Sequence, residues 1–223
     1  MKKTKQKTML SPFTVYEYKF TAMRLEDMAL MPAEWTMSVD LVILKTDKEE
    51  MEEVEIDVQQ VFQKLQFWTD VNLADCIFVN ASNEQELKLA YLFDNNIVTV
   101  PGDVLESLIV QILHAKMTSL AGERLYVGEM RLGASDSRIK YTFGKVKEYE
   151  LPLKVSDYFE DAQNPDDKAW WYRDDGFSYE FLKGYVDEAS DPMEEFHKTM
   201  KLINNQDTMA DIVKVEKWQP KTV

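Results

Sequence analysis

The helical pattern between Val104 and Ala121 constrains the fold of this chain more than any other feature. Its apolar side chains recur at three- and four-residue spacing and form one broad stripe, which a helix can bury only against a second layer of structure. Asp103 is the expected N-cap, Glu106 completes a capping box, and Gly122 stands where a positive φ commonly ends a helix. The chain therefore needs a sheet or further helices to cover this stripe.

Extended segments lie on both sides of this helix. Residues 47–50 are all charged and predict a turn, after which residues 54–56 are expected to return as the second strand of a hairpin. The small and polar residues 133–137 predict another hairpin turn. Apolar, β-branched and aromatic side chains predict strands at residues 13–20, 35–45, 75–80, 97–100, 125–132 and 138–147.

Helical spacing also appears elsewhere in the chain. Asp57 is the expected N-cap of a helix whose apolar positions run to Trp68. Shorter helices are predicted at residues 83–93 and 192–203, and a final strand at 212–215. These elements predict an α+β fold in which a mainly antiparallel sheet carries its helices on one face.

The length of 223 residues suits one large domain with an elaborated tail. We expect a flexible basic arm at residues 1–12, an α+β core domain at 13–150, and an acidic, aromatic-rich C-terminal extension at 151–223. The charge of the arm fits a solvated segment or a docking site for an anion, and the sequence leaves both open.

Few side chains of the kind that build catalytic or metal centres are present. Cys76 is the only cysteine and lies in an apolar stretch, so we expect no intrachain disulfide, a buried inert thiol and a reducing compartment. The two histidines, His114 and His197, are far apart in the sequence, and His114 borders the apolar stripe of the long helix. We therefore predict no catalytic residues, no metal and no cofactor.

The net charge of −14 is unevenly distributed, because residues 157–195 hold 13 acidic and only 3 basic side chains. Such a surface repels nucleic acid, so we do not expect direct nucleic-acid binding. It serves solubility, attracts a basic partner, or imitates a phosphate backbone.

No apolar run reaches the roughly 20 residues of a membrane-spanning helix. The basic N-terminus is not followed by an uninterrupted apolar segment, so it does not read as a signal peptide. We expect a cytoplasmic protein without membrane contact, found in the host cytoplasm or the virion if a bacteriophage encodes it.

Aromatic side chains gather between acidic residues of the C-terminal extension. They either pack back on the domain or form a subunit or partner interface, where tryptophan and tyrosine are favoured anchors. The candidate interface residues are Trp170, Trp171, Tyr172, Phe177, Tyr179 and Phe181.

Three short motifs resemble a known family. Residues 55–58 precede a helix, residues 101–106 open the long helix, and Leu125 to Glu129 form a strand with Tyr141 after it. In these motifs residues 13–143 are similar to 6-pyruvoyl-tetrahydropterin synthase and the related 6-carboxy-tetrahydropterin synthase, which share the tunnelling or T-fold. The resemblance implies an oligomeric assembly in which the Glu129 carboxylate binds a heterocyclic ligand and Tyr141 lies near that ligand. The three zinc-binding histidines of that family are absent here, which implies that the synthase reaction is lost.

These observations favour a non-catalytic binding or assembly protein, of a size and acidity that fit a bacteriophage protein. It would act through oligomerisation or through contacts with another protein. One alternative is an enzyme or ligand binder of the pterin or deazapurine class that uses Glu129. Another is an acidic decoy for a nucleic-acid-binding protein.

Overall fold

The computed structural model describes residues 8–46, 49, 51–93, 95–137, 141–143, 168–179, 191–194 and 196–198. A six-stranded sheet has the order β4-β3-β1-β2-β5-β6. Its strands are β1 (Thr8–Glu26), β2 (Ala29–Thr46), β3 (Cys76–Asn80), β4 (Ile97–Val100), β5 (Leu125–Ala134) and β6 (Tyr141–Phe143). The helices are α1 (Met51–Asn72), α2 (Glu84–Ala90), α3 (Glu106–Ala121), the 3-10 turn Trp170–Tyr172 and a short helical stretch within 192–198. The predicted α+β class with a mostly antiparallel sheet is confirmed.

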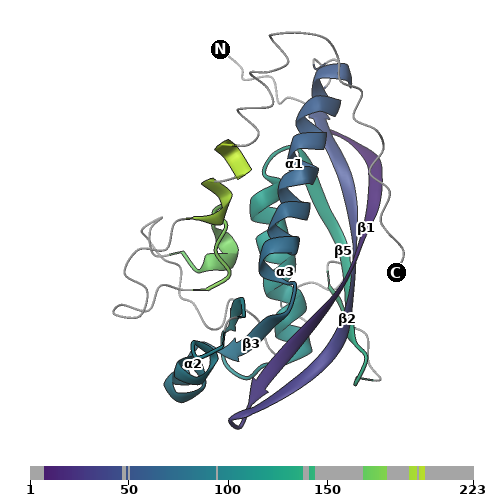
Figure 1. Ribbon diagram of the computed structural model, residues 1–223. Helices are drawn as coiled ribbons and strands as arrows, with labels where there is room; N and C mark the ends of the chain where they lie inside the picture. The colour runs from purple at the N-terminus through teal and green to yellow at the C-terminus, as the bar shows by residue number, and fades with distance from the viewer. Residues whose placement is uncertain are drawn as a thin grey trace, which may run out of the picture.

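A long antiparallel hairpin of β1 and β2 forms the centre of the sheet (Figure 1). Its two-residue turn, Asp27 and Met28, has φ values of 51° and 62°, as a hairpin turn that follows the natural strand twist requires. The predicted returning strand at 54–56 is wrong, because these residues lie in α1, which begins at Met51; residues 47, 48 and 50 of the predicted turn lie outside the described residues. The helical spacing extends back from Val58 to Val54, and both side chains are buried.

Strand directions divide the sheet into two regions. β1 pairs in parallel with β3, and β3 pairs in parallel with β4. On the other side, β2 pairs antiparallel with β5, and β5 with β6. The predicted strands at 75–80 and 97–100 therefore form, and they build a small parallel region beside the hairpin.

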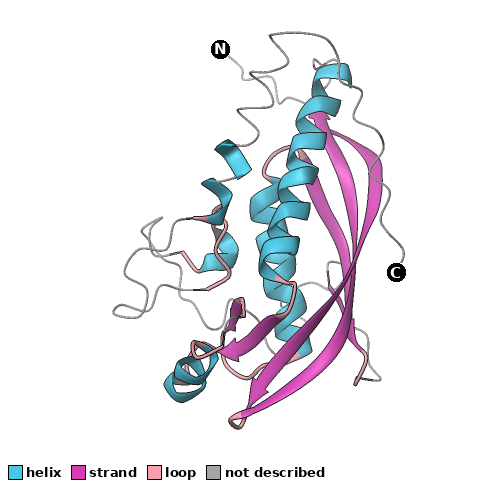
Figure 2. Ribbon diagram, viewed as in Figure 1, coloured by secondary structure: helices cyan, strands magenta, loops and turns pink. Residues whose placement is uncertain are grey.

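The long helices α1 and α3 cover one face of the sheet (Figure 2). The short helix α2 packs on the opposite face, against the parallel strands. Alternation along β3 makes this possible, because Cys76 and Phe78 belong to the main core while Ile77 and Val79 pack with α2. None of the described helices is long and apolar enough to span a membrane.

The ends of α3 differ in how well the sequence predicts them. Gly122 has a φ of 59° and its amide donates to the carbonyl of Thr118, as expected at a helix end. The prediction that Asp103 caps the helix is wrong, because the N-cap is Leu105, which makes no side-chain cap hydrogen bond. Asp103 instead lines a cavity described below.

Both expected tails contribute to the described fold. β1 begins at Thr8, so residues 8–12 of the expected arm lie in a strand. In the C-terminal extension, Trp170, Trp171 and Met193 belong to the main hydrophobic core. The expected strand at 212–215 and Phe181 lie outside the described residues.

Candidate functional site

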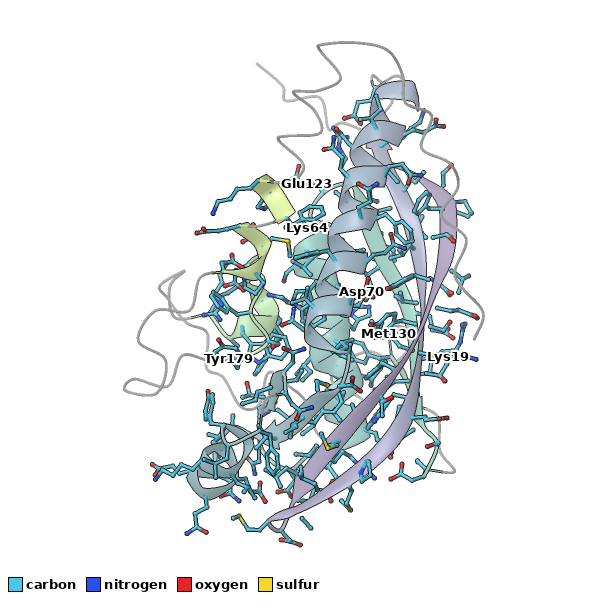
Figure 3. The ribbon with its side chains drawn as sticks, in the orientation of Figure 1. Lys19, Lys64, Asp70, Glu123, Met130 and Tyr179 are labelled. Carbon is cyan, nitrogen blue, oxygen red and sulfur yellow. The ribbon has the colours of Figure 1, made fainter. Side chains whose placement is uncertain are left out.

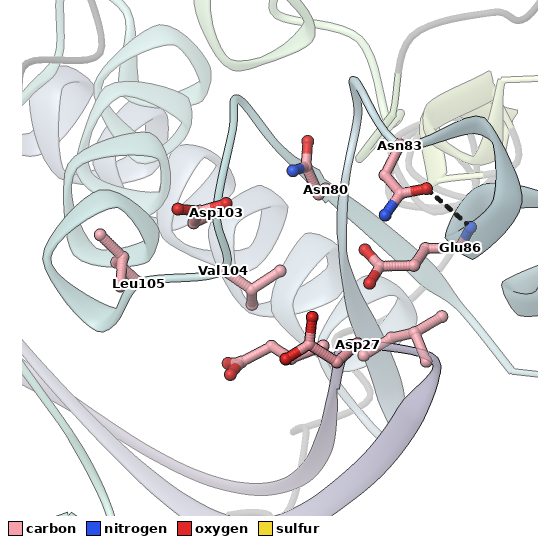
Figure 4. A pocket seen from close by; sticks show the side chains of 9 residues that line it. Asp27, Asn80, Asn83, Glu86, Asp103, Val104 and Leu105 are labelled. Carbon is pink, nitrogen blue, oxygen red and sulfur yellow. Dashed lines mark hydrogen bonds between the residues drawn. The ribbon is translucent and has the colours of Figure 1, made fainter.

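An acidic cavity of about 340 Å³ lies at the carboxyl ends of the three parallel strands (Figure 4). The end of each strand, together with the segment that follows it, contributes three residues to the lining. Parallel strands present their carboxyl ends at one edge of a sheet, and this edge is where open α/β sheets commonly bind ligands. The lining consists of Leu25, Glu26 and Asp27 at the end of β1 and the turn after it, Asn80, Asn83 and Glu86 from the end of β3 to α2, and Asp103, Val104 and Leu105 after β4.

The lining is strongly negative, because four of its nine residues are carboxylic acids and none is basic. Two asparagines add amide groups, but their carbonyl oxygens are engaged locally. The Asn83 side chain accepts hydrogen bonds from the amides of Gln85 and Glu86 and so caps α2. The Asn80 side chain accepts from the amide of Ser82 at 2.8 Å. The amides therefore shape the loop after β3, and the charge of the cavity comes from the acids.

Glu86 is the most unusual member of the lining. Its side chain is buried, with 5% of the residue exposed, yet no hydrogen bond or ion pair engages its carboxylate among the described residues. Figure 4 shows the carboxylates of Glu86 and Asp27 directed toward each other from α2 and from the hairpin turn. A buried carboxylate is costly unless a positive charge or hydrogen-bond donors compensate it.

The basic residue beside the cavity is already engaged. Arg24 precedes the lining on β1, and its guanidinium pairs with Glu106 at 3.3 Å and also with Asp136. It approaches Glu26 only to 3.9 Å. Burial raises the pKa of Glu106, against the opposing effects of Ser137 and Arg24. Arg24 therefore pairs mainly with Glu106 and Asp136, and among the acids of the lining it approaches Glu26.

A second cavity, also of about 340 Å³, lies across β1 and β2. Its lining contains one acid and one base, so it has no strong charge preference. The lining residues are Lys19, Phe20, Thr21, Glu34, Trp35 and Thr36.

The predicted ligand residues Glu129 and Tyr141 line neither of these two cavities. Glu129 on β5 is buried, and its Oε1 lies 2.6 Å from Nη2 of Arg131. Arg131 in turn approaches Asp40 of β2 at 3.7 Å. Tyr141 is opposite Leu132 in the sheet and packs at the edge of the main core. A role of Glu129 and Tyr141 in ligand binding stays a prediction.

The candidate interface aromatics divide into buried and exposed members. Trp170, Trp171 and Phe177 are buried within the chain, so the first of the two alternatives, packing back on the domain, holds for them. Tyr179 is half-buried and Tyr172 is 43% exposed, and a role of these two residues in an interface stays a prediction.

This aromatic segment also closes one edge of the sheet. The amide of Thr99 on β4 donates to the carbonyl of Ser178, and the Ser178 hydroxyl donates to the carbonyl of Ile97. The Trp170 indole donates to the carbonyl of Thr99. Covering an edge strand in this way protects it from pairing with other chains.

A fully buried lysine, Lys116 of α3, holds the same aromatic segment in place through hydrogen bonds. Its ammonium donates to the carbonyls of Trp170 and Arg173 and to the carboxylate of Asp175, at 3.0 to 3.1 Å. Burial lowers its pKa to about 8. Lys64 on α1 (Figure 3) also has a lowered pKa because of burial, although Asp174, Asp175 and Asp191 oppose that effect.

His114, His197 and Cys76, which the sequence analysis also considered, have contacts typical of residues with a structural role. The Nε2 of His114 lies 2.9 Å from the carbonyl oxygen of Gly128, and its ring meets Phe143 edge-on. Burial lowers the pKa of His114 and raises that of the Cys76 thiol. The ring of His197 packs edge-on against the ring of Phe196. Within the described part of the chain, no three histidine, cysteine or acidic residues are arranged to hold a metal ion.

Sequence reasoning missed the acidic cavity, although a signal was present. Acidic or amide residues stand at the end of each of the three strands or just after it, at Glu26 and Asp27, at Asn80, and at Asp103. These residues converge only if the strands are parallel neighbours, and the first strand was predicted to end at residue 20, short of Glu26.

The fold and cavity define an α+β protein with an acidic site at the ends of parallel strands. No family model matches the chain, and no curated protein matches it significantly.

Proposed function

We propose that this chain is a non-catalytic binding protein and that its acidic cavity receives a positively charged ligand. The observation that carries the proposal is Glu86, whose side chain is buried and whose carboxylate faces the cavity and has no partner among the described residues. A cation in the cavity would supply the missing counter-charge.

Electrostatics and size both support this function. With Asp27, Asp103 and Glu26 in the same lining, the cavity attracts cations and repels anions. Its volume of about 340 Å³ is at the lower end of the range for small-ligand pockets. The proposal narrows the expected binding or assembly role, while oligomerisation and contacts with another protein stay predictions.

A matched pair of variants on α2 tests the proposal. Glu86→Gln removes the charge inside the cavity, and Glu84→Gln removes a charge from an exposed side chain of the same helix, where Glu84 pairs with Lys88. Calorimetric titration with organic ammonium ions, and with neutral molecules of the same shape, should show cation binding that Glu86→Gln weakens and Glu84→Gln leaves unchanged. Equal effects of the two variants, or equal binding of neutral molecules, would contradict the proposal.

A second candidate, the pterin or deazapurine binder, is supported by the sheet order. The neighbours β1, β2, β5 and β6 are sequentially antiparallel, and α1 and α3 cover one face, as the T-fold resemblance implies. Titration with a tetrahydropterin, together with Glu129→Gln and an elemental analysis for zinc, tests this candidate. Pterin binding that Glu129→Gln abolishes would favour it over the acidic cavity.

A further inference from the structure

We propose that the ligand of the acidic cavity is a linear aliphatic polyamine. This inference rests on the proposed function, and it adds the chemical class of the ligand. It is carried by three features of the lining: the unpartnered buried Glu86, the distribution of the other acids, and the aliphatic walls between them.

The negative charge is spread over three separate segments of the chain. Glu26 ends β1 and Asp27 follows it, Glu86 lies on α2, and Asp103 follows β4. No three of these acids are arranged to hold a single metal ion. A compact divalent cation needs several oxygen ligands within one short radius, whereas an extended cation with several ammonium groups meets carboxylates at separate points. The arrangement therefore favours the extended, multiply charged ligand.

Between the acids, the wall of the cavity is aliphatic. Leu25 and Val104 are buried, and Leu105 remains partly exposed at the start of α3. Methylene groups gain free energy when they leave water for such surfaces, at about 25 cal/mol per Å². A polyamine alternates ammonium groups with methylene chains, so it matches both parts of this lining.

An ammonium on an aliphatic stem can also come from a lysine side chain of another protein. A single lysine brings one positive charge to a lining with four carboxylates; paired with the buried Glu86, it would leave the mutual repulsion of the half-buried Glu26 and the exposed Asp27 and Asp103 uncompensated. A free polyamine brings several charges at once. We therefore assign the site to the free polyamine and treat a lysine peptide as a competing outcome of the test.

The experiment is isothermal titration of the full chain at fixed ionic strength. The probes are spermidine, 1,4-diaminobutane, butylamine, Mg²⁺ and a short lysine-containing peptide. Spermidine is expected to bind with one-to-one stoichiometry and at least about tenfold more tightly than butylamine, because each additional charge-assisted contact contributes about 1.5 kcal/mol or more.

Variants connect this binding to the cavity. Glu86→Gln is expected to weaken spermidine binding about tenfold, since one charge-assisted contact is lost. Asp27→Asn provides a second lining variant at an exposed turn, where asparagine tolerates the positive φ. Glu84→Gln on the outside of α2 is the matched control and should leave the affinity unchanged.

The possible outcomes separate this inference from the proposed function. If butylamine or the lysine peptide binds as tightly as spermidine and Glu86→Gln weakens both, the cavity binds cations but the polyamine inference is wrong. If Mg²⁺ binds more tightly than spermidine, the inference is also wrong. If no cation binds, or if Glu84→Gln weakens binding as much as Glu86→Gln does, both the inference and the proposed function fail.

Discussion

The ammonium of Lys116 lies 3.0 Å from the carboxylate of Asp175, and this buried ion pair joins α3 to the C-terminal aromatic segment. Two backbone carbonyls of the segment complete the hydrogen bonds of the ammonium. The rings of Trp68 and Trp170 lie 5.9 and 5.8 Å from the same nitrogen, within the range of cation–π attraction. The core thus holds the segment through one cation as well as through apolar contacts.

Replacing Lys116 with methionine is expected to lower the free energy of unfolding by about 3 kcal/mol. The substitution keeps an apolar side chain in place but removes the ammonium from Asp175 and from the carbonyls of Trp170 and Arg173, although Asp175 still pairs with Arg173. Urea denaturation measures the loss, and hydrogen exchange should show faster exchange of amides in residues 168–179. The exposed Lys88→Met serves as control and should change stability by less than about 0.5 kcal/mol. Equal stability of Lys116→Met and the wild type would contradict this account.

The lowered pKa of Lys116 also predicts how the free energy of unfolding changes with pH. Burial lowers the pKa of Lys116 from 10.5 to about 8, so between these values the folded state has lost a proton that the unfolded state retains. Stability should therefore rise with pH in this window. The difference in unfolding free energy between wild type and Lys116→Met isolates this contribution, and it should grow by about 1.5 kcal/mol from pH 8 to pH 9.5. A flat or falling difference would be inconsistent with a buried ammonium.

Neutralising Glu86 should stabilise the unliganded protein. Glutamine has nearly the same shape, and it removes a buried charge that has no partner among the described residues. We expect Glu86→Gln to raise the free energy of unfolding by about 1 kcal/mol. Thermal denaturation at neutral pH, with Glu84→Gln as control, measures the change. A loss of stability would show that the carboxylate has a structural role.

The hairpin turn beside the cavity offers a further test. Met28 has a φ of 62°, a conformation that glycine adopts without the steric penalty of a side chain. Met28→Gly should therefore raise the free energy of unfolding by about 1 kcal/mol. Ala29→Gly, one position later in β2, should lower it, because that residue lies in an extended strand. Chemical denaturation of the two variants should move the midpoint in opposite directions.

Much of the fold could be predicted from local patterns. The stripe on α3, the end of that helix at Gly122, and the strands that became β3 and β4 were all readable, because spacing and turn residues are local properties. The start of α1 was misread, because an acidic helix turn and a charged loop have similar composition. The cap of α3 was misread because Asp103 lies in the cavity lining instead.

The sequence by itself determined the class of this protein: apolar periodicity required an α+β core, and the excess of acids set its negative charge. Only the tertiary structure decided where the acids meet. Parallel pairing of β1, β3 and β4 brings Asp27, Glu86 and Asp103 to one cavity, and packing against α3 buries Lys116 beneath the aromatic segment. Strand pairing and helix packing join residues distant in the chain, so no local pattern encodes these contacts.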